Sequence, residues 1–222
     1  MKDPRLIIYI VVILAGLLIF FAVKTGRLTK KNEQLQILYQ AALEDSITDY
    51  LTKLYNIRHL TARLKEEIAR AIRFSHIIQI LYIDLDNFKE VNDNLGHNAG
   101  DEVLKQTADI IRKCLRQYDL VARGAIGDEF VAVLPKTSRK LCLRAAKAIL
   151  EQIEKINING GEIKISASIG VHQFDGKRAE EWREKDTAKL AEESIGAADR
   201  AMYEAKAAGK GRVAASAPKR KK

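Results

Sequence analysis

The stretch LVARGAIGDEFVAVL, residues 120–134, decides the fold, because two short apolar runs flank a turn that contains two glycines. Apolar runs of this length around a glycine-containing turn are typical of a β-hairpin. The same turn carries two adjacent carboxylates, Asp128 and Glu129. Two acids at a turn between buried strands lower stability unless a cation or a ligand compensates their charge. We therefore expect this hairpin to contribute to a binding site.

Helices and strands alternate on both sides of the hairpin. The hydrophobic periodicity predicts strands at residues 77–83 and 163–171, and helices at residues 60–74, 101–116, 141–157 and 194–208. Together with the hairpin, these elements give a βαββαβ pattern. The predicted fold class is α/β, an α+β sandwich with a mixed, mostly antiparallel central sheet flanked by helices.

Two acidic residues follow the predicted strand 77–83. Asp84 and Asp86 are two positions apart, so their side chains project from the same face of a strand. A calcium loop does not explain them, because Lys89 occupies the position where such a loop requires glycine. Carboxylates that converge from two neighbouring strands, Asp84 and Asp128, would instead form an oxygen site for Mg²⁺, with Mn²⁺ as the alternative ion. Such a metal would in turn hold nucleotide phosphates.

Five motifs occur in a fixed order over residues 46–213. They are D-x-L-T-x-L-Y-N at 49–56, IDLDNFKEVNDNLGHNAGDEVL at 83–104, VARGAIGDEF at 121–130, SASIGV at 166–171 and AADRAMYEAKAAGKGRV at 197–213. In sequence and order they resemble the GGDEF domain of diguanylate cyclases. The resemblance implies a palm-like GGDEF fold and an enzyme that condenses two GTP molecules into cyclic di-GMP, with release of pyrophosphate, across a homodimer.

The resemblance also implies roles for individual residues. Asp84, the Leu85 carbonyl and Asp128 would bind the metal, and either Asp128 or Glu129 would assist deprotonation of the attacking 3′-hydroxyl. The residues expected to bind substrate are Phe88, Lys89, Asn92, Asp101, Gly127, Lys206 and Lys210. Within that set, Asn92 and Asp101 would read the guanine edge, and the two lysines would contact phosphates. The family usually has arginine where this chain has Lys210, which keeps the charge but loses the bidentate fork.

Two further features bear on regulation and activity. Arg116 and Asp119 match the R-x-x-D product-inhibition site, which would bind cyclic di-GMP. The signature itself reads IGDEF: Ile126 replaces the usual first glycine, and one extra residue separates Arg123 from the acidic pair. A β-branched residue would disfavour positive φ and intrude on GTP, unless the extra residue reshapes the turn as a bulge. The alternative function is a catalytically degenerate module that binds GTP or cyclic di-GMP and acts as a signalling receptor or scaffold.

Residues 6–23, LIIYIVVILAGLLIFFAV, contain no charged side chain. A helix of that length would span about 27 Å, enough for the hydrocarbon core of a bilayer. A cleaved signal peptide is the alternative, but no A-x-A site follows the run. Lys24, Arg27, Lys30 and Lys31 come directly after it, so the positive-inside rule places the domain in the cytoplasm. We expect a single-pass protein of the bacterial inner membrane.

The rest of the chain divides around this segment. The expected parts are a flank at 1–5, a transmembrane helix at 6–23, a stalk at 24–48, the GGDEF domain at 49–213 and a basic tail at 214–222. In the stalk, Leu28, Leu35 and Ala42 recur every seven residues, which indicates a short parallel coiled coil or, alternatively, a single connecting helix. The tail accounts for four of the positive charges in a net charge of +9, and no nucleic-acid partner is expected.

Overall fold

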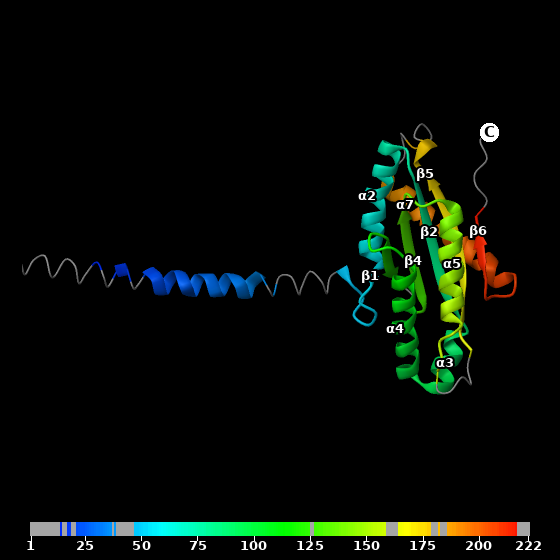
Figure 1. The fold of residues 1–222 in the computed structure, drawn as a ribbon, viewed down its shortest axis with the longest axis horizontal. Helices are drawn as coiled ribbons and strands as arrows, with labels where there is room; N and C mark the ends of the chain where they lie inside the picture. Colours follow the sequence, from blue (N-terminus) through cyan, green and yellow to red (C-terminus); the bar gives the residue numbers. More distant parts are fainter. Residues whose placement is uncertain are drawn as a thin grey trace, which may run out of the picture. The chain divides into compact units, whose positions relative to one another are not determined.

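The computed structural model describes residues 14, 17–18, 21–36, 38, 47–124, 127–158, 164–178, 182 and 186–216. The chain divides into two compact units, Met1–Ser46 and Ile47–Lys222. The second unit contains every strand of the sheet and all of the named helices (Figure 1).

The first unit contains a helix over residues 21–36, whose side chains are exposed. Among the residues that the structure describes, no helix combines the length and the apolar character needed to cross a bilayer. This finding contradicts the predicted single-pass inner-membrane location. The described helix at residues 21–36 contains Lys24, Arg27 and Glu33, and charged side chains are costly inside a bilayer. Most of residues 6–23 lies outside the described residues.

A six-stranded mixed sheet forms the centre of the second unit, in the order β1-β3-β4-β2-β5-β6 (Figure 1). The strands are β1 (Tyr55–Asn56), β2 (Ile77–Asp86), β3 (Leu120–Arg123), β4 (Glu129–Pro135), β5 (Ser166–Asp175) and β6 (Val213–Ala215). The four central strands pair antiparallel, and the short edge strands β1 and β6 pair parallel with β3 and β5. The predicted mixed, mostly antiparallel sheet is therefore confirmed.

Helices cover both faces of this sheet, and each face has its own hydrophobic cluster. The helices are α2 (Ile57–Phe74), α3 (Phe88–Leu95), α4 (His97–Cys114), α5 (Arg139–Ile153) and α7 (Thr187–Ala207), with a 3₁₀ turn, η1, at Gly176–Arg178. One cluster joins α3, α4 and α5 to the sheet, and the other joins α2 and α7. Because the side chains of β2 alternate between the faces, Ile83 and Leu85 lie in the first cluster and Ile78 and Ile80 in the second.

Two helices begin earlier than predicted, because a capping side chain sets the first residue of each. The Asn56 side chain accepts a hydrogen bond from His59 N at 2.9 Å, so α2 begins three residues earlier than predicted. Asp186 caps α7 in the same way and extends that helix by seven residues at its start. Gly96 has a φ of 82° and separates α3 from α4, whereas α3 was not predicted.

Candidate active site

The ends of β2 and β4 bring the acidic signature next to Asp84. Asp84 pairs with Glu129 in the antiparallel register, and Leu85 N donates a hydrogen bond to Asp128 O at 3.2 Å. Leu85 is itself buried in the core, so its backbone rather than its side chain is available to a ligand. The register therefore places the carboxylates expected from the sequence at one end of the central strand pair.

Asp84 is the most deeply buried acid of this group, with 6% of its surface exposed. Lys206 Nζ, from α7, lies 2.7 Å from Asp84 Oδ1. Burial raises the pKa of Asp84, Lys206 opposes that rise, and the charges of Asp128 and Glu129 add to it. The site thus has an excess of negative charge that one lysine only partly compensates.

This donor set fits a hard divalent cation. No cluster of three His, Cys, Asp or Glu side chains able to hold a metal occurs within the described part of the chain. Mg²⁺ does not need one, because it is usually bound by one or two carboxylates, with substrate phosphates and water completing its octahedron. The carboxylates of Asp84 and Asp128 with the Leu85 carbonyl would supply such a partial shell.

Tyr82 separates the chemical environments of the two signature acids. Its hydroxyl donates a hydrogen bond to Glu129 Oε2 at 2.8 Å, and burial together with Glu129 raises the pKa of Tyr82. The Asp128 carboxylate makes no hydrogen bond within the described residues. Sequence reasoning missed Tyr82, although its position two residues before Asp84 places it on the same face of the strand.

Asp86 has a structural role that its spacing from Asp84 did not reveal. It is 2% exposed and accepts hydrogen bonds from Ser168 Oγ, Ser166 Oγ and Gly211 N at 2.8, 2.8 and 2.9 Å. These hydrogen bonds link β2 to β5 and to the turn after α7. We therefore assign Asp86 a structural role. That turn is the one that carries Lys210.

The turn after α7 positions the second predicted cation. Lys210 has a φ of 60° between Gly209 and Gly211, which have φ values of 113° and 56°. Its Nζ donates a hydrogen bond to Asn87 Oδ1 at 2.7 Å, directly after β2. Lys206 and Lys210 therefore both contact the end of β2, as phosphate-binding cations of this site would have to do.

The residues expected to read guanine lie on α3 and α4. A Cβ built on Gly100 would be 2.0 Å from Asn92 Oδ1, so the Asn92 side chain packs directly against Gly100 and would have to shift if this residue carried a Cβ. Asp101 is the next residue along α4 and is partly exposed. Phe88 is 9% exposed and packs in the core, whereas Lys89 is exposed. The structure brings Asn92 and Asp101 to the same corner, and Phe88 serves mainly as core.

Arg123 ties the signature turn to the start of the domain. Its Nε and Nη2 donate to Gly127 O at 3.0 and 2.7 Å, and its Nη1 lies 3.3 Å from both Asp49 oxygens. Gly124 N donates to Glu129 O at 2.7 Å, and a Cβ on Gly124 would be 2.7 Å from Glu129 Cβ. Gly124 is thus required for space, since it has no positive φ. Residues 125 and 126, and with them the isoleucine, lie outside the described residues.

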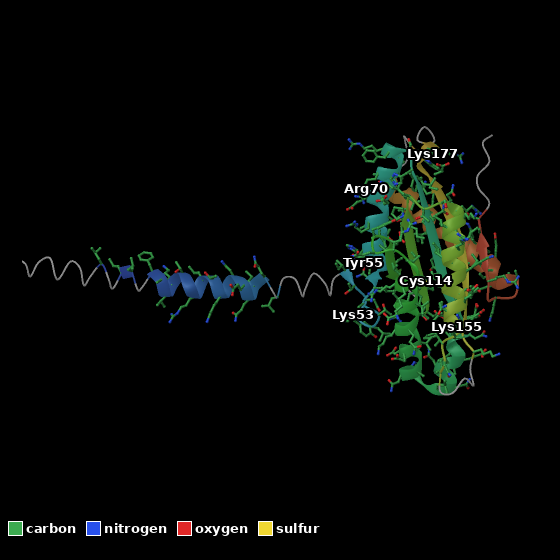
Figure 2. All side chains as sticks on the ribbon, viewed as in Figure 1. Lys53, Tyr55, Arg70, Cys114, Lys155 and Lys177 are labelled. Carbon is green, nitrogen blue, oxygen red and sulfur yellow. The ribbon has the colours of Figure 1, made fainter. Side chains whose placement is uncertain are left out.

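Lys53 occupies a position where the backbone favours glycine. Its φ is 56°, in the left-handed region that non-glycine residues rarely adopt. The Arg112 guanidinium donates to the Lys53 carbonyl and holds this turn beside β1, where Lys53 and Tyr55 lie close together (Figure 2). A glycine at position 53 would adopt this conformation without strain.

The predicted product-inhibition residues form a local turn before β3. Arg116 N donates to Asp119 Oδ2 at 2.9 Å, and Asp119 N donates to Arg116 O at 3.0 Å. Asp119 is 8% exposed, its Oδ1 has no hydrogen-bond partner, and burial raises its pKa. Both residues line a pocket of about 400 Å³ that also includes Arg112.

Comparisons with known proteins agree with this arrangement. The family model described as "Diguanylate cyclase, GGDEF domain" matches residues 46–212. Diguanylate cyclase DosC of Escherichia coli K12 is 40% identical over 168 residues, covering 74% of this chain and 34% of DosC. The chain therefore spans about a third of the length of this curated relative.

Solved structures show the same fold. The GGDEF domain of YfiN (TpbB) from Pseudomonas aeruginosa is 35% identical with a TM-score of 0.65, covering 77% of this chain and 94% of that one. The coiled coil and GGDEF domain of DgcB from Caulobacter crescentus, solved with c-di-GMP, gives a TM-score of 0.78 at 22% identity, covering 88% and 99%. The latter likeness concerns the fold alone. Members of this family are generally metal-dependent. The chain belongs to the GGDEF-domain diguanylate cyclase family.

Proposed function

We propose that this protein is a diguanylate cyclase that condenses two GTP molecules into cyclic di-GMP and releases two pyrophosphates. The observation that carries the proposal is the convergence of Asp84, Asp128 and Lys206 at one end of the β2–β4 pair. The family match and the diguanylate cyclase DosC, as a relative, support it.

In this proposal Asp84, Asp128 and the Leu85 carbonyl hold Mg²⁺ or Mn²⁺. When bound, the metal neutralises triphosphate charge and lowers the pKa of the attacking 3′-hydroxyl. Lys206 and Lys210 pair with phosphate oxygens, since both ammonium groups lie at the end of β2. Lys89 and the Gly127 backbone complete the phosphate-facing surface.

Glu129 is our candidate for accepting the proton of the 3′-hydroxyl. Asp128 is committed to the metal, and a metal-bound carboxylate is a weak base. Tyr82 holds Glu129 through Oε2 at 2.8 Å, which leaves Oε1 to accept the proton. Asp101 accepts from guanine N1–H and N2–H, with Asn92 beside it, so that GTP is chosen over ATP.

Two copies must face each other, because each holds one of the two nucleotides that are joined. We propose a homodimer whose GGDEF domains, residues 49–213, are joined through a coiled-coil stalk at 24–48. Leu28 and Leu35 are one heptad apart and 52% and 64% exposed, as seam residues of an unpaired helix would be. Residues 214–216 continue the pairing with β5 and so belong to the domain. The basic residues that follow them in the sequence have no part in the proposed reaction.

The Arg116–Asp119 turn is proposed to bind cyclic di-GMP as an inhibitor. Its pocket offers a guanidinium and a buried carboxylate oxygen without a partner, which suit a phosphate and a guanine edge. The alternative, a degenerate receptor module, is not favoured, and the contacts of Asp84 with Lys206 and of Lys210 with Asn87 support the enzyme instead.

The test is a product assay on the full chain with GTP and Mg²⁺. We expect cyclic di-GMP from the wild type, none after chelation of the metal, and none from Asp128→Asn. Asp109→Asn, which changes an exposed acid on α4, is the matched control and should retain activity. Unchanged product formation by Asp128→Asn would refute the metal assignment.

A further inference from the structure

We propose a second ligand site, distinct from the nucleotide site, in a pocket of about 460 Å³ at the open edge of β5. The ligand class is a small aromatic anion, a phosphate or carboxylate attached to an apolar ring. The pocket lies between β5, the first half of α7, η1 and the start of α5, and no role in the cyclase reaction uses it.

The pocket exists because β6 is shorter than its neighbour. β6 pairs with β5 only at residues 169–171, and the last ladder bond runs from Ser216 N to Val171 O at 2.9 Å. Beyond this point, residues 172–175 of β5 pair with β2 alone. At the far end Trp182 Nε1 donates to Asp175 O at 3.0 Å, next to η1, whose Lys177 marks that end of the sheet in Figure 2.

The floor of the pocket is apolar and fixed. Phe174, Trp182 and Leu190 are 3%, 8% and 2% exposed, and the two aromatic rings pack with centroids 5.2 Å apart. Ser194, also in the wall, donates its hydroxyl to Leu190 O at 2.7 Å and so presents no free donor. A ring placed here would contact side chains that are already held by the core.

Three arginines line the rim, Arg139, Arg178 and Arg200. Arg139 Nη2 donates to Ser216 O at 2.8 Å, while its Nη1 is buried without a hydrogen-bond partner. A buried guanidinium N–H without a partner is costly, so this atom favours an anionic acceptor. Arg200 makes no ion pair within the described residues.

These features together define the ligand. Guanidinium groups bind phosphate and carboxylate through paired charge-assisted hydrogen bonds. Asp175 and Glu193 on the rim offset part of the positive charge, and Asp175 Oδ1 is already engaged by Lys177 N at 3.0 Å. The volume suits one small molecule. The chain's own residues 217–222 follow Ser216 but carry four positive charges, which the arginine rim would repel.

The pocket contains its own reporter. Trp182 is the only tryptophan of the chain, so tryptophan emission excited on the long-wavelength side of tyrosine absorption reports on this site. We would titrate the full chain with phenyl phosphate, benzoate, inorganic phosphate and phenol. Phenyl phosphate and benzoate separate the two anionic groups, inorganic phosphate lacks the ring, and phenol lacks the anionic charge.

We expect saturable quenching by phenyl phosphate or benzoate with a Kd of about 1 mM or lower, and weaker binding of phenol and inorganic phosphate. Arg139→Gln and Arg200→Gln should each weaken binding about tenfold, the loss expected for one charge-assisted hydrogen bond. Arg144→Gln, an exposed arginine on α5 outside the pocket, should bind as the wild type.

Equal binding of phenol and phenyl phosphate would overturn the proposal, as would unchanged affinity in both arginine variants. A chain ending at Ser216 should bind as the full chain does. If removing residues 217–222 alone shifts Trp182 emission, the tail is the occupant and the proposal is wrong. Asp84→Asn should lose cyclic di-GMP synthesis and keep probe binding, so failure of this site and failure of the cyclase are distinguishable.

Discussion

The helix that carries Lys206 packs closely against the sheet at Gly170 on β5. A Cβ added there would be 2.0 Å from Ala198 O and 2.2 Å from Met202 N, both backbone atoms of α7. Ordinary contact begins near 3.4 Å, so Gly170→Ala requires α7 to move outward by about 1.4 Å. Lys206 lies one turn beyond Met202 and would move with the helix.

The expected loss of stability is about 3 kcal/mol, at the upper end for an added methyl group in a packed core, because backbone cannot rotate away. For a chain of this size, that loss lowers the melting temperature by about 6–12 °C. Circular dichroism during heating measures the change. At a temperature where both proteins are folded, we also expect slower cyclic di-GMP synthesis, since the 2.7 Å contact between Lys206 and Asp84 would lengthen.

Gly196→Ala on the same helix is the matched control. A Cβ there would meet only Arg200 Nη1 at 3.5 Å, a flexible side-chain atom. Replacing glycine by alanine inside a helix should therefore stabilise the protein by about 0.5–1 kcal/mol. If Gly170→Ala melts within a degree of the wild type, or if both variants shift in the same direction, the proposed close packing is refuted.

Three further predictions concern single residues. Lys53→Gly should raise the free energy of unfolding by about 0.5–1 kcal/mol in urea titrations, because it relieves a φ of 56°; a loss of stability would contradict this. Tyr82→Phe removes the hydrogen bond that holds Glu129 Oε2, so the turnover number for cyclic di-GMP should fall about tenfold while KM for GTP stays unchanged; an unchanged turnover number means that Tyr82 does not position Glu129. Burial raises the pKa of Asp84 in the folded state, so ionisation of this carboxyl lowers the stability of the wild type as pH rises from about 4 through the raised pKa. In metal-free buffer, Asp84→Asn should therefore gain stability relative to the wild type over this pH range. A stability difference that does not change with pH would argue against this.

The sequence was sufficient for the central part of the fold. The hairpin at 120–134 and the buried strand at 77–83 were both visible as apolar runs, and the structure pairs these three strands antiparallel. Edge strands β1 and β6 have two and three residues, too few for a period to be visible. Helix α3 was missed because Gly96 divides one polar stretch into two helices.

The acidic residues of the site were predictable from the sequence, but the residues that hydrogen-bond to them or hold the neighbouring turns were not. Asp84 and Asp128 stand out as charges at strand ends, whereas Tyr82, Asp86 and Arg123 contact partners that are 47 to 125 residues away in the sequence. Such contacts depend on register, which one sequence does not specify. The predicted membrane location is contradicted, because no helix among the residues that the structure describes is able to cross a bilayer.

One time course tests the central claim most directly. The full chain is incubated with GTP and Mg²⁺, and chromatography follows GTP, pyrophosphate and cyclic di-GMP together. The proposed reaction predicts two GTP consumed and two pyrophosphates released for each cyclic di-GMP formed, with none of these changes in Asp84→Asn. GTP bound but not consumed, or GTP converted to GDP and phosphate, would contradict the assignment of this site as a cyclase.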